Sequence, residues 1–479
     1  MASLKKNIFY NSIRVGSNLV FPLVTFPYVT RIMGPDSLGL YNYVTAIVSY
    51  FTLFASLGFP LYGTREIAQA KDNDKQMQSV TNAIFTSSML ACLLVYVVYF
   101  AFSLFLAHNS AEFWIYTILG FSILLSCISF DWFFQGIEDF QFITIRSLII
   151  RFVSIIGLFL FVRSKEDIVY YAILTVVGTC GNNIWNLVRI NKYVKLRLSF
   201  RDCWKHTKGA LMFFLGSIIV SLYTNLNGVM VGALGTMAAV AYFTTGNKIV
   251  NLVMTFLGAV ASSIMPRMSY LLKSGDESEA LDLQRKTLSL LNYIAIPVTI
   301  GMIVLAHPLV MLFGGVEFKP AVLVMQVLSP LLVIVTLSQF LSNQILVPLH
   351  LEKYNNYCVL GGALVNMVLN VILIPKYAEI GVSLAVLCSE VVVTAMFFFY
   401  SSKHMKLSLG DFVPVKCILS SAIMGIVIFL LFDESFGLAW LFVFTLLGIL
   451  VYIVSLYLMK DRFLRYFLSL VMKNKYGKK

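Results

Sequence analysis

The sequence predicts an all-α polytopic membrane protein of about 14 transmembrane helices, built as two six-helix lobes followed by two additional helices. Three observations predict this class: composition, length and an internal repeat. Of the 479 residues, 59% are hydrophobic and only 12% are charged, whereas soluble proteins carry roughly 25% charged residues. The mean hydropathy is +0.84. This composition excludes a soluble enzyme, a disordered protein and a nucleic-acid-binding module, so we expect no nucleic-acid partner.

Length sets the number of spans, because one helical span needs about 20 apolar residues. All of the apolar segments are of helix length, and none shows the alternating ten-residue pattern of a membrane β-barrel. The predicted spans are 8–33, 40–62, 80–106, 112–134, 142–162, 168–190, 210–232, 238–264, 288–313, 320–347, 355–375, 380–400, 414–431 and 437–459.

Basic residues predict the orientation of these spans. With the N-terminus in the cytoplasm, 27 of the 36 lysines and arginines fall in cytoplasmic connections and tails, four fall outside and five lie within spans. Cytoplasmic loops of membrane proteins carry such an excess. We therefore expect a multi-pass protein of the cytoplasmic (inner) membrane. Both of its termini are expected on the cytoplasmic side. The tail 460–479 is typical of an amphipathic helix that lies on membrane lipids.

The internal repeat predicts the domain organisation. The run Gly34 to Tyr41 follows the first span, and the run Gly235 to Tyr242 follows the seventh span with the same spacing. Parallel repeats of this kind occur in transporters. The expected parts are an N-terminal six-helix lobe (1–190), a basic cytoplasmic linker (191–209), a C-terminal six-helix lobe (210–406), two additional transmembrane helices (407–459) and a basic cytoplasmic tail (460–479).

Polar residues inside the spans recur at steps of three, four or seven, which places them on single helix faces. Such stripes either join helices by hydrogen bonds or line a hydrated cavity. Where a stripe also carries a charge we favour the cavity, because a charge in the bilayer centre costs at least about 2.5–3.5 kcal/mol. The polar residues expected to line it are Asn18, Asn182, Asn251, Gln339 and Asn343.

Cationic residues within the spans are the predicted substrate-binding groups. Arg14, Arg151 and Lys248 lie well inside their spans and are the strongest candidates. Arg31 and Arg146 lie nearer the span ends, where we favour extension of their side chains to the lipid head groups. A cationic lumen attracts anions in a low dielectric. The predicted substrate is therefore anionic or carries a phosphate, for which the planar arginine fork is well suited.

Two acidic residues are candidates for coupling or charge pairing. Glu390 lies at the middle of its span, where it either pairs with a basic residue or carries a coupling ion, H⁺ or Na⁺. Asp131 lies about one turn from a span end, and its alternative role is an interfacial carboxylate paired with Arg146 or Arg65. Cysteine and histidine spacing predicts no metal site. No phosphate-binding Gly-rich loop or large soluble segment is present, so no cofactor and no catalytic activity are expected.

Several short runs of the sequence are distinctive. The first is the loop Thr30-Arg31-Ile32-Met33-Gly34-Pro35-Asp36-Ser37-Leu38-Gly39-Leu40-Tyr41. The others are Gly63-Thr64-Arg65-Glu66, Gln135-Gly136-Ile137-Glu138, and Ile374-Pro375-Lys376-Tyr377 with Gly381. These runs resemble the polysaccharide transporter family, the flippases of lipid-linked O-antigen and capsule repeat units, and the resemblance covers nearly the whole chain.

The resemblance implies two lobes around a central cleft that work by alternating access, in the superfamily that also contains multidrug exporters and lipid II flippases. It implies a polyprenyl-diphosphate-linked oligosaccharide as substrate, with the polysaccharide polymerase and glycosyltransferases of the pathway as possible partners. The alternative is a cation-coupled multidrug-type exporter of the same superfamily. A polymerase or ligase is disfavoured, because the outer loops are too short for a catalytic site.

Overall fold

The computed structural model describes residues 4–107, 109–404, 407, 409–412, 414–432, 439–461 and 463–465. These residues form helices and contain no β-strand, which confirms the predicted fold class. Most of the predicted tail, residues 466–479, lies outside the described part. By contacts the chain divides into two compact units, Met1–Ala241 and Tyr242–Lys479.

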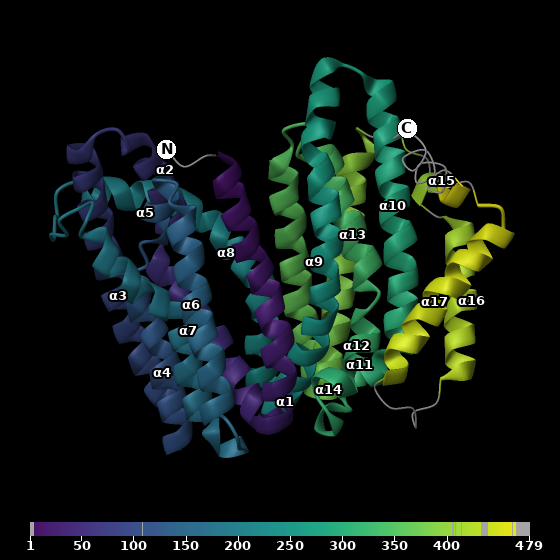
Figure 1. The fold of residues 1–479 in the computed structure, drawn as a ribbon, viewed down its shortest axis with the longest axis horizontal. Coiled ribbons are helices and arrows are strands. Elements are labelled where there is room, and N and C mark those ends of the chain that lie inside the picture. Colours follow the sequence, from purple (N-terminus) through teal and green to yellow (C-terminus); the bar gives the residue numbers. More distant parts are fainter. Residues whose placement is uncertain are drawn as a thin grey trace. The chain divides into compact units, whose positions relative to one another are not determined.

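Unit 1 is a helical bundle built around one long, kinked helix (Figure 1). Helix α1 packs against α3, α4, α6 and α8, and α7 packs between α4 and α6. Its elements are α1 (Leu4–Ser56), α2 (Phe59–Ala70), α3 (Asp74–Leu106), α4 (Ser110–Ser126), α5 (Asp131–Gly136), α6 (Phe140–Phe161), η1 (Lys165–Asp167), α7 (Ile168–Ile190) and α8 (Cys203–Leu234).

The kink of α1 corresponds to the short loop predicted between the first two spans. Gly34 has φ 69° and ψ 176°, a backbone conformation that glycine adopts without steric cost. Pro35 follows it and removes a backbone donor, which prevents a continuous helix through this point. The long stretch from Phe9 to Ala70 therefore contains two membrane spans.

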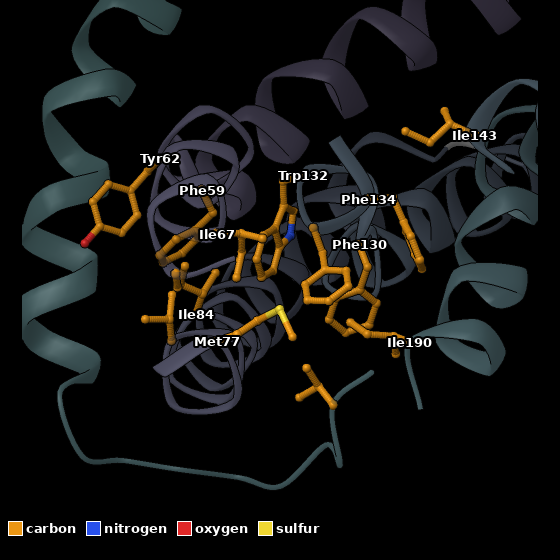
Figure 2. Packing of buried hydrophobic residues seen from close by; sticks show 14 of the residues in the cluster. Phe59, Tyr62, Ile67, Met77, Ile84, Phe130, Trp132, Phe134, Ile143 and Ile190 are labelled. Atoms are coloured by element: carbon orange, nitrogen blue, oxygen red, sulfur yellow. The ribbon is translucent and has the colours of Figure 1, made fainter. Parts of the chain in front are cut away.

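An aromatic cluster closes one end of unit 1. Phe59 and Ile67 of α2 meet Phe130, Trp132 and other buried side chains of α5 and its neighbours (Figure 2). Gly63 makes this approach possible, because a Cβ atom there would lie 2.6 Å from the Trp132 ring. The short helix α5 lies where the sequence predicts the end of the span 112–134 and the loop that follows it. Asp131 is the first residue of this helix.

Unit 2 contains the remaining spans (Figure 1). Helix α10 packs against α13 and α16, and α14 packs against α12 and α13. A buried cluster of mainly aliphatic and phenylalanine side chains joins α9, α10, α13 and α14. The elements are α9 (Met237–Ser274, which begins in unit 1), α10 (Glu277–Val304), α11 (Ala306–Phe313), η2 (Val316–Phe318), α12 (Ala321–Leu328), α13 (Leu331–Leu341), η3 (Ser342–Leu346), α14 (Glu352–Ser402), α15 (Leu409–Phe412), α16 (Val415–Leu431) and α17 (Ala439–Leu458).

The observed helices account for the predicted spans. Among the described residues, eight helical stretches are long and apolar enough to cross a membrane, and the bent helix α8 makes a ninth. The kinked helices α1 and α14 each cover two predicted spans, with the break of α14 at Ala378. The shorter apolar helices α4 and α16 account for two more, and α7, which is not among the eight stretches, covers the predicted span 168–190. The chain is therefore a multi-pass membrane protein.

The contact-based units differ from the predicted lobes by one helix. Helix α8, predicted as the first helix of the lobe 210–406, packs against α1, α2 and α3 and lies in unit 1. The predicted linker 191–209 is correspondingly attached to unit 1. Tyr62 of α2, for example, bonds to His206 at the start of α8 at 2.8 Å. Sequence repetition and packing thus divide this chain at different places.

Candidate functional site

Two arginines of unit 1 lie close together at the α1–α6 contact. The guanidinium of Arg151 on α6 donates to the hydroxyl of Ser17 on α1 at 2.8 Å. The same hydroxyl donates to the carbonyl oxygen of Arg14 at 2.7 Å, and Arg14 donates to Asn11 at 3.0 Å. Arg151 also lies 5.8 Å from the ring centroid of Phe21. Ser17 therefore links the two basic residues.

This arginine pair has no carboxylate partner in the described part of the chain. Neither residue forms an ion pair there, and the two guanidinium groups repel each other electrostatically. The Nε atom of Arg14 is buried and has no hydrogen-bond partner. Buried donors without partners are costly. The arrangement is therefore suited to receive an anion that supplies several acceptor oxygens.

Arg146 lies on the same helix as Arg151 but in a different environment. Its side chain is only 1% exposed and forms an ion pair with Asp131 of α5 at 2.8 Å. Asn186 and Asn182 of α7 accept two further hydrogen bonds from the guanidinium group. The favoured interpretation that Arg146 extends to the head groups is wrong, because three neighbouring acceptors hold it inside the bundle.

Further polar residues near Arg146 extend these contacts into a network of hydrogen bonds and ion pairs in unit 1. Asn186 also donates to Asp131 at 2.8 Å. Arg189 pairs with Asp139 at 2.8 Å and lies over the Phe142 ring at 4.1 Å. The alternative that we gave for Asp131, an ordinary carboxylate paired with Arg146, is the arrangement observed. Asn182, predicted to line a cavity, is half-buried and bonded to this network.

The predicted polar residues of α9 lie on an exposed face. Lys248 and Asn251 are both exposed, and Asn251 donates to Asn247 one turn earlier at 2.9 Å. Thr255 continues the same stripe and is also exposed. In unit 1, Asn18 and Arg31 of α1 are likewise exposed. These side chains are accessible to a solute or to lipid.

The two predicted lining residues near the end of α13 are half-buried. Gln339 faces α9 closely, because a Cβ atom added to Gly258 would lie 2.9 Å from its Oε1 atom. Asn343 lies in η3, a single π-turn that follows α13. The contact of Gln339 is the kind expected of a polar residue between helices, so the structure places it against a neighbouring helix.

Glu390 of α14 is 6% exposed and lies among apolar and hydroxyl side chains. Thr394, one turn later, bonds to the Glu390 carbonyl at 2.8 Å, and its hydroxyl lies 2.6 Å from that of Ser338 on α13. Within the described residues, the carboxylate of Glu390 forms neither an ion pair nor a hydrogen bond. The cationic partner considered from the sequence is therefore absent there.

Two residues that hold these arginines in place were not selected from the sequence. Ser17 lies three residues after Arg14, on the same helix face, and this spacing was the available signal. Asn186 lies four residues after Asn182, on the same helix face, but its partner Asp131 is separated from it by 55 residues. Only the fold brings these two residues together.

Unit 2 also holds an apolar cavity of about 530 Å³ between α10, α16 and α17. Its walls include Pro297 and Gly301 of α10, Met424 of α16 and Gly448 of α17. Several lining residues, such as Ile449 (51% exposed), are also exposed on the surface of the protein. A cavity of this composition accepts a hydrocarbon chain.

Comparison with known proteins adds family relationships to this geometry. A family model described as polysaccharide biosynthesis protein matches residues 4–272, and the MatE model matches residues 213–372. The chain is 25% identical over 404 residues to a protein of Escherichia coli K12 described as an O-antigen transporter. The match covers 83% of this chain and 96% of that relative.

Solved structures show the same fold. The lipid II flippase MurJ, in an inward closed conformation, superposes with a TM-score of 0.78 at 16% identity. This match covers 95% of the present chain and 99% of that one. A multidrug resistance MATE family transporter in an inward-facing conformation gives a TM-score of 0.65 at 14% identity, covering 83% and 97% of the two chains.

Proposed function

Since the chain belongs to the polysaccharide biosynthesis protein family, we propose that it translocates a polyprenyl-diphosphate-linked oligosaccharide across the cytoplasmic membrane by alternating access. The family is one of transporters and flippases and not of enzymes. The transported repeat unit would serve the biosynthesis of a surface polysaccharide such as O-antigen or capsule. Its polymerase and glycosyltransferases would then be the partners on either side of the transport step.

The arginine pair Arg14 and Arg151 is the single observation that carries this proposal. Two guanidinium groups that meet no carboxylate among the described residues would be costly inside a membrane bundle unless a ligand neutralises them. A diphosphate supplies two adjacent anionic groups and matches the bidentate geometry of arginine. The hydroxyl of Ser17, between the two groups, orients Arg151 before the substrate arrives.

The apolar cavity of unit 2 supports the lipid part of the substrate. It is lined mainly by apolar side chains, so a prenyl chain that enters it from the bilayer keeps apolar surroundings and packs against these side chains. A soluble anion would gain nothing from this cavity. The cavity therefore supports a substrate that carries a hydrocarbon tail.

Glu390 supports ion coupling in the proposed cycle. A buried carboxylate without a cationic partner is unfavourable when ionised, so it tends to bind a proton or a metal cation. Binding H⁺ or Na⁺ at Glu390 would let an ion gradient drive the conformational change. The basic connections support a cytoplasmic location of both termini and insertion in the inner membrane.

The second candidate function is export of small drugs coupled to a cation, favoured by the MatE match over residues 213–372. The arginine pair argues against a cationic drug as substrate, because like charges repel. The two functions are separated by reconstituting the full chain in vesicles with a fluorescent lipid-linked oligosaccharide, and separately with a cationic dye.

We expect transfer of the lipid-linked oligosaccharide to the opposite leaflet and no dye transport. Arg151→Gln should abolish the transfer, whereas Arg163→Gln, in an exposed loop, should leave it unchanged. Dye export without lipid transfer would establish the second function and contradict the proposal.

A further inference from the structure

The connection between α7 and α8 is fixed along one face of α3. Gln78 accepts a hydrogen bond from the backbone N–H of Lys195 at 3.2 Å and donates to its carbonyl. Asn82 accepts from the N–H of Arg197 at 3.1 Å, and Thr86 accepts from the N–H of Ser199 at 2.9 Å. The three α3 residues are spaced by four and so share one helix face. This connection is therefore an ordered, extended strip.

The strip exposes large apolar side chains on the side away from α3. Leu198, Phe200 and Trp204 are 57%, 69% and 76% exposed. Leu196, two residues before Leu198, packs instead against the aromatic cluster of unit 1. Three backbone hydrogen bonds to α3 hold this connection in place, so Leu198 and Phe200 stay exposed at a fixed position, and Trp204 follows in the first turn of α8.

Six exposed cations surround these apolar side chains. They are Lys192, Lys195, Arg197, Arg201, Lys205 and Lys208. In the described part of the chain none of the six forms an ion pair, and Asp202 is the single carboxylate between residues 191 and 209. We call residues 192–208 the basic strip. Its positive charge is available to an external anionic surface.

The level of the basic strip along α3 identifies that surface. Ser87 of α3 contacts the carbonyl oxygen of Cys203 at 3.4 Å, next to Trp204. Within the next two turns of α3, Met89, Leu90 and Leu93 are exposed apolar residues, 41%, 50% and 54% respectively. The lipid-facing surface of α3 thus begins beside Trp204. Aromatic and basic side chains at such a boundary favour the head-group region of a membrane.

We propose that the basic strip binds the head groups of anionic phospholipids in the leaflet that it faces. The phosphate groups pair with the cations, while Phe200 and Trp204 insert between the head groups. This binding anchors the α7–α8 connection to the membrane surface as well as to α3. It is independent of the transported substrate and would hold even if the proposed function were wrong.

Tryptophan quenching in nanodiscs containing the full chain tests this binding. Brominated phosphatidylglycerol or brominated phosphatidylcholine is added at the same mole fraction, and emission is compared between the natural chain and Trp204→Phe. The difference between the two proteins reports Trp204 alone. At low salt we expect the anionic lipid to quench Trp204 about threefold more than the zwitterionic lipid, with the preference falling in high salt.

Charge variants provide the matched comparison. The triple change Arg197→Gln, Arg201→Gln and Lys205→Gln should remove the preference for anionic lipid. Neutralising Arg267, Lys273 and Arg285, which lie near the α9–α10 connection, should leave it unchanged. Equal quenching by both lipids would overturn the proposed selectivity. Absence of quenching by either lipid would show that the basic strip faces water or another protein, and would overturn the proposal.

Discussion

Arg146 and Arg151 lie five residues apart on α6, yet the structure gives them opposite environments. Arg146 is enclosed by Asp131, Asn182 and Asn186. Arg151 has the Ser17 hydroxyl and the face of Phe21 but, among the described residues, no carboxylate. Residue type and membrane depth alone therefore do not distinguish a structural arginine from a ligand-binding one.

The presence of a partner makes the difference. A charged side chain that is paired within the fold stabilises one conformation, and its charge and hydrogen-bond donors are no longer available to a substrate. A charge that lacks a counterion keeps its binding capacity and depends on hydration or ligand to remain favourable. We infer that Arg146 organises unit 1 and that Arg151 acts in binding.

The largest effect is expected from Arg146→Ala. It leaves Asp131 and two asparagines without their shared donor, and breaking a buried pair costs about 3–5 kcal/mol. We expect the lower end of this range, because the Asp131 side chain is 34% exposed. Folded yield and Tm in detergent should fall strongly, as measured by size-exclusion chromatography and thermal unfolding.

A double variant separates the charge from the packing. Arg146→Met with Asp131→Leu removes both charges together and should recover much of the lost stability. If the double variant were as unstable as the sum of both single variants, the ion pair would not be the stabilising feature and the comparison would fail.

Arg151→Ala should have the opposite signature. Because Arg151 has no buried counterion in the described part of the chain, we expect near-normal yield and Tm but loss of lipid-linked oligosaccharide transfer in vesicles. Arg151→Lys keeps the charge without the bidentate fork and should retain part of the activity. A collapse in Tm with Arg151→Ala would show that this arginine, too, is structural.

Glu390→Gln extends the comparison of paired and unpaired charges to unit 2. The carboxylate of Glu390 has no cationic partner among the described residues. The neutral amide resembles the protonated carboxyl, so we expect a folded protein of at least normal stability. Its transport should no longer respond to an imposed proton or sodium gradient. Transport measured with and without each gradient checks this expectation, and an unchanged response to both would exclude Glu390 as the coupling group.

The smallest effect is expected from Asp167→Asn in the exposed turn before α7. Backbone hydrogen bonds from Arg163, then the Ser164 hydroxyl and the Ser164 N–H, lower the pKa of Asp167 below its usual 3.8. A carboxylate whose folded pKa is lowered stabilises the folded state above its unfolded pKa. That contribution is lost as the pH falls through the lower folded value.

The Tm difference between the natural chain and Asp167→Asn should therefore be small at pH 7 and should shrink below about pH 4. Glu166→Gln removes a carboxylate one position earlier in the same turn and serves as the matched control, because the oxygen that accepts the capping bonds belongs to Asp167. A difference that grew with acid would contradict the assigned direction.

The sequence predicts the helical segments well, because apolar length and turn residues are local properties. Gly34 and Pro35 mark the kink of α1, as expected from their backbone preferences. The pairing of Asp131 with Arg146 was available only as an alternative, because a sequence does not show which helices are adjacent. The attachment of α8 to unit 1 was missed for the same reason.

The candidate site shows the same limit. Helical spacing placed Arg14 and Asn18 on one stripe, but the link from Ser17 to Arg151 spans 134 residues. Likewise, Gln339 follows the predicted stripe yet packs against Gly258 of another helix. Periodicity identifies a polar face, whereas tertiary packing decides whether that face meets a neighbour or an open surface.

The side chains of Gln78, Asn82 and Thr86 on α3 limit how the length of the α7–α8 connection can change in evolution. Because the backbone N–H groups of Lys195, Arg197 and Ser199 are held at every second residue, loss or gain of a single residue there would point the following N–H groups away from their acceptors on α3. Changes by two residues would preserve the alternation. This connection should therefore tolerate changes in length by two residues better than changes by one.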